Sequence, residues 1–123
     1  MKKILIIDDE PQILLVSAAR LKGNGYDVVT AVSGEQGLEK AKKEMPDLVL
    51  LDHVMPEMDG GEVLERLKKD PVTKHIPVII FTADVPKVKA LEFQARGAAD
   101  CLYKPFLPNE LLSKVKEFLE KKS

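Results

Sequence analysis

Residues 4–9 read ILIIDD, four apolar residues followed directly by two aspartates. The same arrangement recurs twice, as LVLLD at residues 48–52 and as VIIFT at residues 78–82. Short apolar runs bounded by turn residues are typical of strands that are buried on both faces, as in parallel sheets. The carboxyl ends of parallel strands lie at one edge of the sheet, where ligands bind. We therefore expect the polar residues that end these runs to converge on one site.

Apolar residues at helical spacing separate these strands, and residues 27–32 and 100–103 add two more predicted strands. Residues that commonly begin or cap helices stand before the helical segments: Pro11, Gly34, Asp59, Asp84 and Pro108. The segment after Asp84 is predicted to bury Val88, Leu91 and Ala95 and to end at Gly97. Strands and helices therefore alternate along the whole chain.

This alternation predicts an α/β fold with right-handed crossovers and a parallel sheet between two helix layers. Five such units fit a flavodoxin-like (βα)5 three-layer sandwich, whose five-stranded sheet has the order 2-1-3-4-5. The switch point of that order lies between the first and third strands, which end in Asp8-Asp9 and in Asp52. The expected binding crevice therefore coincides with the aspartates.

The bulk composition is that of one globular domain spanning residues 1–123, with 45% hydrophobic and 32% charged residues. A net charge of −1 provides no general attraction to nucleic acid or to acidic lipid. The single cysteine, Cys101, excludes an intramolecular disulfide and a cysteine zinc cluster. No apolar stretch approaches the roughly 20 residues of a membrane span. We expect a cytoplasmic protein without membrane attachment.

The polar residues at the strand ends suit phosphate and metal chemistry. Crowded carboxylates repel one another unless a cation neutralises them, and Mg²⁺ prefers carboxylate, water and phosphate oxygens. An aspartate beside such an ion can attack phosphorus and form an acyl phosphate. Lys104 and the Thr82 hydroxyl could then meet the charge on the phosphoryl oxygens, while the small Ala83 leaves room for the group.

At these residues the sequence resembles the receiver domain of response regulators in two-component signalling, over essentially its whole length. The motifs that carry the resemblance are Ile6-Ile7-Asp8-Asp9-Glu10, Leu50-Leu51-Asp52, Met55-Pro56-Glu57-Met58-Asp59-Gly60, Thr82-Ala83 and Lys104-Pro105-Phe106. Each motif is short, but together they stand in order, at the ends of the expected strands.

The resemblance implies a role for each residue at the predicted site. Asp52 would be the phosphoacceptor, and Asp9 would bind Mg²⁺ directly. Asp8 would bind the ion directly or through water, and Val54 would contribute its backbone carbonyl. Lys104 and Thr82 would contact the phosphoryl group.

The resemblance also implies partners. The phosphoryl group would come from a histidine kinase or a histidine phosphotransfer protein, and the receiver would slowly hydrolyse it. The protein would then be no enzyme beyond its own phosphorylation and dephosphorylation. Its signal would pass to a downstream protein through the surface of the fourth helix, fifth strand and fifth helix, without direct binding of nucleic acid. A stand-alone regulator and a receiver excised from a longer protein both fit the sequence.

One position departs from the family pattern. Receivers usually carry Tyr or Phe three residues before the lysine, as a side chain that turns inward when the threonine moves toward the phosphate. Cys101 stands there in this chain, and Tyr103 lies on the same face of the predicted strand. The signal would then run either through Tyr103 or through the loop after Thr82.

Two other classes of function use related chemistry. A phosphatase or mutase of the haloacid-dehalogenase type also has an aspartate nucleophile and Mg²⁺. Those enzymes show an Asp-x-Asp pattern that begins at the nucleophile, whereas Val54 occupies the third position here. A flavin or nucleotide binder would need a glycine-rich phosphate loop after the first strand, where this chain has Asp8-Asp9-Glu10-Pro11. We therefore prefer the receiver.

Overall fold

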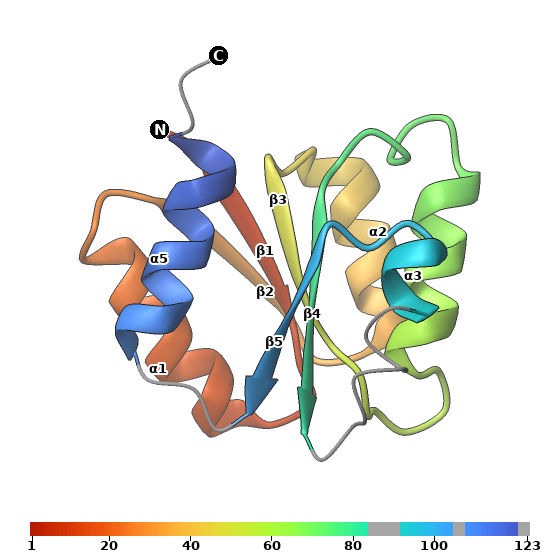
Figure 1. The fold of residues 1–123 in the computed structure, drawn as a ribbon, viewed down its shortest axis with the longest axis horizontal. Coiled ribbons are helices and arrows are strands. Elements are labelled where there is room, and N and C mark those ends of the chain that lie inside the picture. Colours follow the sequence, from red (N-terminus) through yellow and green to blue (C-terminus); the bar gives the residue numbers. More distant parts are fainter. Residues whose placement is uncertain (84–91, 105–107, 121–123) are drawn as a thin grey trace.

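The structure of the chain is a computed structural model that describes residues 1–83, 92–104 and 108–120. Five parallel strands form one sheet in the order β2-β1-β3-β4-β5 (Figure 1). The strands are β1 (Lys3–Ile7), β2 (Asp27–Ala31), β3 (Leu48–Asp52), β4 (Val78–Ala83) and β5 (Asp100–Lys104). The predicted order 2-1-3-4-5 is confirmed.

Helices cover both faces of the sheet, which makes three layers. They are α1 (Pro11–Lys22), α2 (Gly34–Glu44), α3 (Gly60–Lys69) and α5 (Pro108–Leu119). Figure 1 shows α1 and α5 on one face and α2 and α3 on the other, with the short helical segment 92–95 beside α3. No helix in the described ranges is both long enough and apolar enough to cross a membrane.

Local signals place the helix ends. Pro11 begins α1, where its missing N–H costs no hydrogen bond. The Asp59 carboxylate caps α3 by accepting a hydrogen bond from the Glu62 N–H at 3.0 Å. Gly97 follows the helical segment 92–95 and has a φ of 111°, a conformation that favours glycine at the end of a helix. The predicted cap at Asp84 lies outside the described residues.

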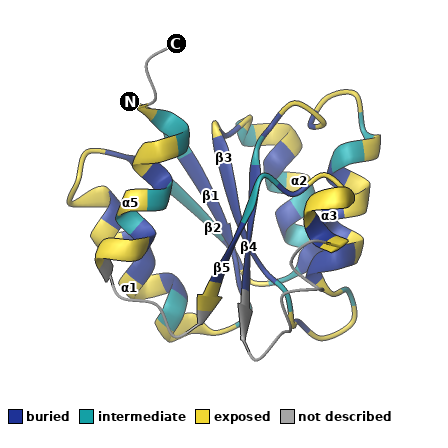
Figure 2. Ribbon diagram, in the orientation of Figure 1, coloured by how far each residue is buried: buried dark blue, intermediate teal, exposed yellow. Residues whose placement is uncertain are grey.

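The sheet separates two apolar layers, and the inner strands β1 and β3 are largely buried, whereas the edge strand β2 is buried only at Ala31 (Figure 2). In β1, Ile4 and Ile6 pack with the layer under α1 and α5. Leu5 and Ile7 pack with the layer under α2 and α3. Successive residues of β1 thus point into opposite apolar layers, which explains why a strand buried on both faces has no polar residues within it.

One residue of a predicted helix face is not buried. Ala95 was expected to be buried, but it is exposed, whereas Phe93 is 1% exposed. The larger phenylalanine removes far more apolar surface from water than alanine does, so burying it is favoured. Val88 and Leu91, the other residues of that predicted face, lie outside the described residues.

Candidate functional site

The register of β1 and β3 brings two aspartates together. Ile7 pairs with Leu51, so Asp8 and Asp52, the next residues, lie side by side at the carboxyl edge of the sheet. Asp8 is fully buried and Asp52 is 5% exposed. The Asp8 N–H donates to the carbonyl of Ala31 at 3.1 Å, which extends the β1–β2 ladder by one bond. The backbone therefore holds both carboxylates at the predicted switch point.

The register of β4 and β5 brings the other predicted residues to the same edge. Phe81 pairs with Asp52, so Thr82 follows one residue beyond it. Ala83 pairs with Lys104. The side chains of Thr82, Ala83 and Lys104 lie outside the described part of the structure, so their contacts with a phosphoryl group stay predictions.

Three carboxylates form a compact group at this edge. One oxygen from each of Asp8, Glu10 and Asp52 lies within 4.8 Å of the others. The backbone N–H of Glu10 donates to Asp8 Oδ1 at 2.9 Å, which turns the chain so that Glu10 joins the group. Carboxylate oxygens at this spacing, two of them on buried residues, fit a divalent cation such as Mg²⁺.

The membership of this group differs from the predicted ligand set. Asp9, predicted to bind the ion directly, is half-buried and does not belong to the group. Glu10, for which no role is predicted above, does belong to it. The signal that could have found Glu10 was its position two residues after Asp8, the spacing of a turn in which an aspartate oxygen accepts a backbone N–H.

The loop after Asp52 is tied to the sheet and to α3. The His53 N–H donates to the Phe81 carbonyl at 2.9 Å, and the His53 carbonyl accepts from the Gly60 N–H at 2.8 Å. A β-carbon at Gly60 would lie 2.5 Å from the Asp52 carbonyl oxygen, so a side chain there would collide with the strand. Val54, within this loop, is 67% exposed. Its predicted role uses the carbonyl, which this exposure does not affect.

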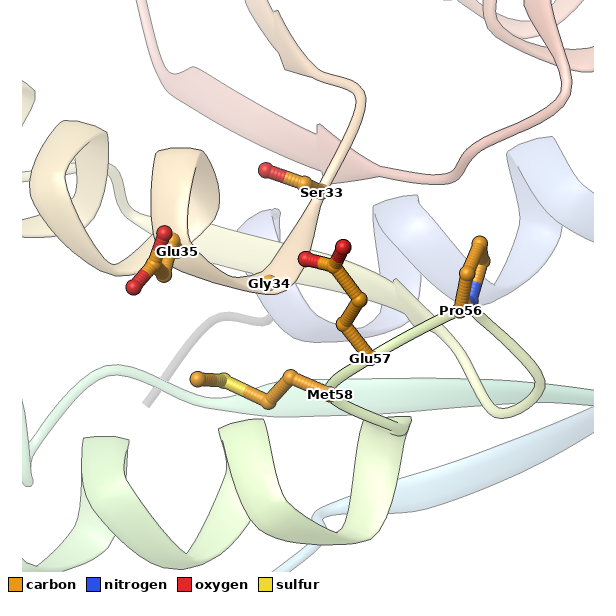
Figure 3. A pocket seen from close by; sticks show the side chains of 6 residues that line it. All are labelled: Ser33, Gly34, Glu35, Pro56, Glu57 and Met58. Carbon is orange, nitrogen blue, oxygen red and sulfur yellow. The ribbon is translucent and has the colours of Figure 1, made fainter.

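A separate hollow of about 210 Å³ lies between this loop and the start of α2. Six residues line it, and none belongs to the carboxylate group: Ser33, Gly34, Glu35, Pro56, Glu57 and Met58. Figure 3 shows the two segments facing each other across it. A β-carbon at Gly34 would come within 2.9 Å of the Met58 sulfur, so glycine allows this close approach.

The position of the usual switch aromatic is buried in this chain. Cys101 packs in the layer under α2 and α3, and the next residue, Leu102, packs in the opposite layer. Burial, and to a lesser extent the neighbouring Asp100 carboxylate, raises the pKa of the Cys101 thiol. Tyr103 is 43% exposed. A small neutral thiol therefore stands where the resemblance to receivers predicts a ring.

Comparison with known proteins identifies the family. The model of the family described as the response regulator receiver domain matches residues 4–116. The chain belongs to this family. The receiver is 41% identical over 123 residues to the alkaline phosphatase synthesis transcriptional regulatory protein PhoP of Bacillus subtilis, covering 98% of the receiver and 49% of PhoP. It is 38% identical to the response regulator PleD of Caulobacter vibrioides, covering 93% of the receiver and 25% of PleD.

The receiver thus spans about half the length of PhoP and a quarter of the length of PleD. Solved structures of its own size are also similar. The Vibrio cholerae chemotaxis protein CheY4 superposes with a TM-score of 0.91 at 34% identity, covering 97% of the receiver and 99% of that chain. A response regulator receiver domain from Clostridium thermocellum gives 0.89 at 32% identity, covering 98% and 95%. The predicted family and flavodoxin-like fold are confirmed, and the chain is a receiver domain of two-component response regulators.

Proposed function

We propose that Asp52 accepts a phosphoryl group from a histidine kinase or a histidine phosphotransfer protein. The observation that carries this proposal is the group of three carboxylate oxygens within 4.8 Å that contains the buried Asp52, at the end of the central strand of a receiver domain. Buried carboxylates this close are electrostatically costly, so the arrangement favours a site built for a cation and a phosphoryl group.

The proposed step moves one phosphoryl group between two side chains. A carboxylate oxygen of Asp52 forms a bond to phosphorus, and the bond between phosphorus and the donor's imidazole nitrogen breaks. The electron pair of that bond stays on the imidazole nitrogen. The signal ends by hydrolysis: water attacks phosphorus, inorganic phosphate leaves, and the Asp52 carboxylate is restored. These two reactions on its own side chain are the whole of the proposed catalytic activity.

The proposed cofactor is Mg²⁺, held by the carboxylates of Asp8, Asp9 and Asp52 and by the Val54 carbonyl. When bound, the ion would neutralise the carboxylates and the incoming phosphoryl oxygens. Asp9 does not belong to the group of carboxylate oxygens within 4.8 Å, so its direct binding of the ion stays a prediction. A magnesium titration compares the contributions of Asp9 and Asp8 to the affinity for the ion. Asp9→Ala should weaken Mg²⁺ binding more than Asp8→Ala if Asp9 is the direct ligand. Equal Mg²⁺ affinities of the two variants would contradict the assignment of Asp9 as the direct ligand.

The proposed contacts to the phosphoryl group come from β4 and β5. Lys104 would supply positive charge and Thr82 a hydroxyl donor to the oxygens on which negative charge develops. Ala83 would leave space for the group. The pairing of Ala83 with Lys104 supports this assignment, because it brings both strand ends to the edge that carries Asp52.

The proposed output is a contact with another protein on the face of residues 92–95, β5 and α5. A hollow of about 410 Å³ on this face supports the assignment, and β5 and α5 line it through Leu102, Asn109, Glu110, Ser113, Lys114 and Glu117. The receiver, which we propose to be one domain over residues 1–123, would act there without binding nucleic acid and without contact with a membrane.

Intact mass spectrometry tests the proposed function. The chain, incubated with Mg²⁺ and a small acyl-phosphate donor, should gain one phosphoryl group. The gain should disappear with Asp52→Ala and with a chelator, and it should persist in Asp59→Ala, which changes a nearby carboxylate outside the group. A full gain in Asp52→Ala would reject the assignment.

A further inference from the structure

His53 is the first residue after the proposed phosphoacceptor, and its backbone is held on two sides. Its N–H donates to the carbonyl of Phe81 in β4, and its carbonyl accepts from the N–H of Gly60 in α3. The backbone of His53 is therefore hydrogen-bonded to both β4 and α3. The half-buried His53 ring is the side chain through which a movement of the Asp52 backbone can leave the sheet.

The ring of His53 contacts Phe93 in an edge-to-face arrangement. The two ring centroids are 4.9 Å apart and the planes meet at 70°, a geometry that aromatic pairs favour. Phe93 is 1% exposed and belongs to the apolar layer under α2 and α3. A buried aromatic ring from the 92–98 segment therefore rests directly on the residue that follows Asp52.

Hydrogen bonds to the Phe93 carbonyl form a turn in the 92–98 segment, and Arg96 attaches this segment to α3. The Phe93 carbonyl accepts hydrogen bonds from the N–H groups of Arg96 at 3.1 Å and Ala98 at 3.0 Å. The Arg96 guanidinium donates to the Gly61 carbonyl at 3.2 Å and pairs with the Glu65 carboxylate at 3.4 Å. These bonds attach the turn that leads from Phe93 toward β5 to helix α3.

Cys101 belongs to the same buried layer as Phe93. A thiol fills far less space than a ring, and packed interiors leave few voids. The layer between the sheet and α3 nevertheless has an aromatic ring, which comes from residue 93 and not from β5. Tyr103, at 43% exposed, does not fill this layer.

We propose that Phe93, through its contact with His53, is the aromatic side chain that couples Asp52 to the 92–98 segment and β5. Its ring takes the space in this layer that an aromatic residue at position 101 would otherwise fill. This inference rests on the proposed function, because it needs phosphorylation of Asp52 as the input. Phe93 is a positioning residue and touches neither the phosphoryl group nor the ion.

A double-mutant cycle tests whether positions 93 and 101 compete for one space. Cys101→Tyr in the wild-type chain should lower the urea midpoint, because the layer already contains the Phe93 ring. In a Phe93→Ala background, Cys101→Tyr should raise the midpoint, because it fills the space that the smaller residue leaves. Equal effects of Cys101→Tyr in both backgrounds would overturn the inference.

The response to phosphorylation tests the coupling itself. Amide chemical shifts of Gly97 and Ala98 are measured with and without Mg²⁺ and an acyl-phosphate donor, and intact mass measures the phosphoryl occupancy of the same sample. Phe93→Leu and His53→Leu should reduce the shift change by about threefold at unchanged occupancy. Phe118→Leu, the same change beside the opposite layer, should leave it intact.

The outcomes separate the two claims. Normal occupancy with an unreduced response in Phe93→Leu would overturn the coupling through Phe93 and leave the proposed function standing. No phosphoryl gain in the wild-type chain would overturn the proposed function, and the coupling with it. A reduced response in Phe93→Leu but not in Phe118→Leu supports the inference.

Discussion

Replacing Gly60 with alanine would place a methyl group against the backbone of the proposed phosphoacceptor. The new β-carbon would lie 2.5 Å from the Asp52 carbonyl oxygen and 2.8 Å from the His53 α-carbon, whereas ordinary contact begins at 3.4 Å. The shortfall is about 0.9 Å against rigid backbone, which a side-chain rotation cannot relieve. Overpacking of this kind costs about 1–3 kcal/mol, and alanine returns up to about 1 kcal/mol in a helix. We expect Gly60→Ala to lower the free energy of unfolding by roughly 1–2 kcal/mol.

Gly61 provides a matched control in the next position of the same helix. A β-carbon there would lie 3.1 Å from a nitrogen at the end of the long Arg96 side chain and 3.3 Å from the Asp59 carboxylate oxygen, so each neighbour need give way by only a few tenths of an ångström. Gly61→Ala should therefore change stability by no more than about 0.5 kcal/mol. Urea unfolding followed by circular dichroism measures both variants. Equal stabilities of the two variants would refute the argument that α3 packs directly on the Asp52 backbone.

Three further changes have definite expected results. Asp59→Ala removes the cap that accepts from the Glu62 N–H and should cost about 1 kcal/mol in urea unfolding; an unchanged midpoint would contradict the cap. Burial and then the hydrogen bond to Glu120 raise the pKa of Tyr26 to about 12 from 10.0. The folded state thus holds this proton more tightly, so the stabilisation is complete below pH 10.0 and is lost as the pH rises through about 12; an absorbance titration should show a late tyrosinate step that Tyr26→Phe removes. Burial also raises the pKa of the Cys101 thiol, so an aromatic disulfide reagent should react slowly with the folded chain and rapidly in urea, and equal rates would contradict this burial.

The sheet and the pairing of its aspartates could be predicted because the evidence for them is local in the sequence. Four-residue apolar runs identify strands that are buried on both faces, and a parallel sheet brings their carboxyl ends to one edge. Asp8 and Asp52 are neighbours for that reason, since Ile7 and Leu51 are paired. No knowledge of individual side-chain positions was needed.

Glu10 and Phe93 were missed for different reasons. The signal for Glu10 is local, namely its position two residues after Asp8, whereas the position of Phe93 depends on a contact between distant residues. Glu10 joins the carboxylates through a turn in which its N–H bonds to Asp8 Oδ1. Phe93 is buried in the layer under α2 and α3 and contacts the His53 ring, at a sequence separation that helical spacing does not reveal. The predicted burial of Ala95 was wrong for the same reason, since periodicity alone does not tell which residues a helix face meets.

The most direct test of the central claim is to locate the phosphoryl group on the unmodified chain. Borohydride reduces an aspartyl phosphate, an acyl phosphate, to the alcohol homoserine. After incubation with Mg²⁺ and an acyl-phosphate donor, the chain is reduced and digested, and its peptides are sequenced by mass spectrometry. We predict homoserine at position 52 alone. Homoserine at Asp8 or Asp9, or a phosphoryl group that survives on a hydroxyl or imidazole side chain, would contradict the assignment of Asp52 as the phosphoacceptor.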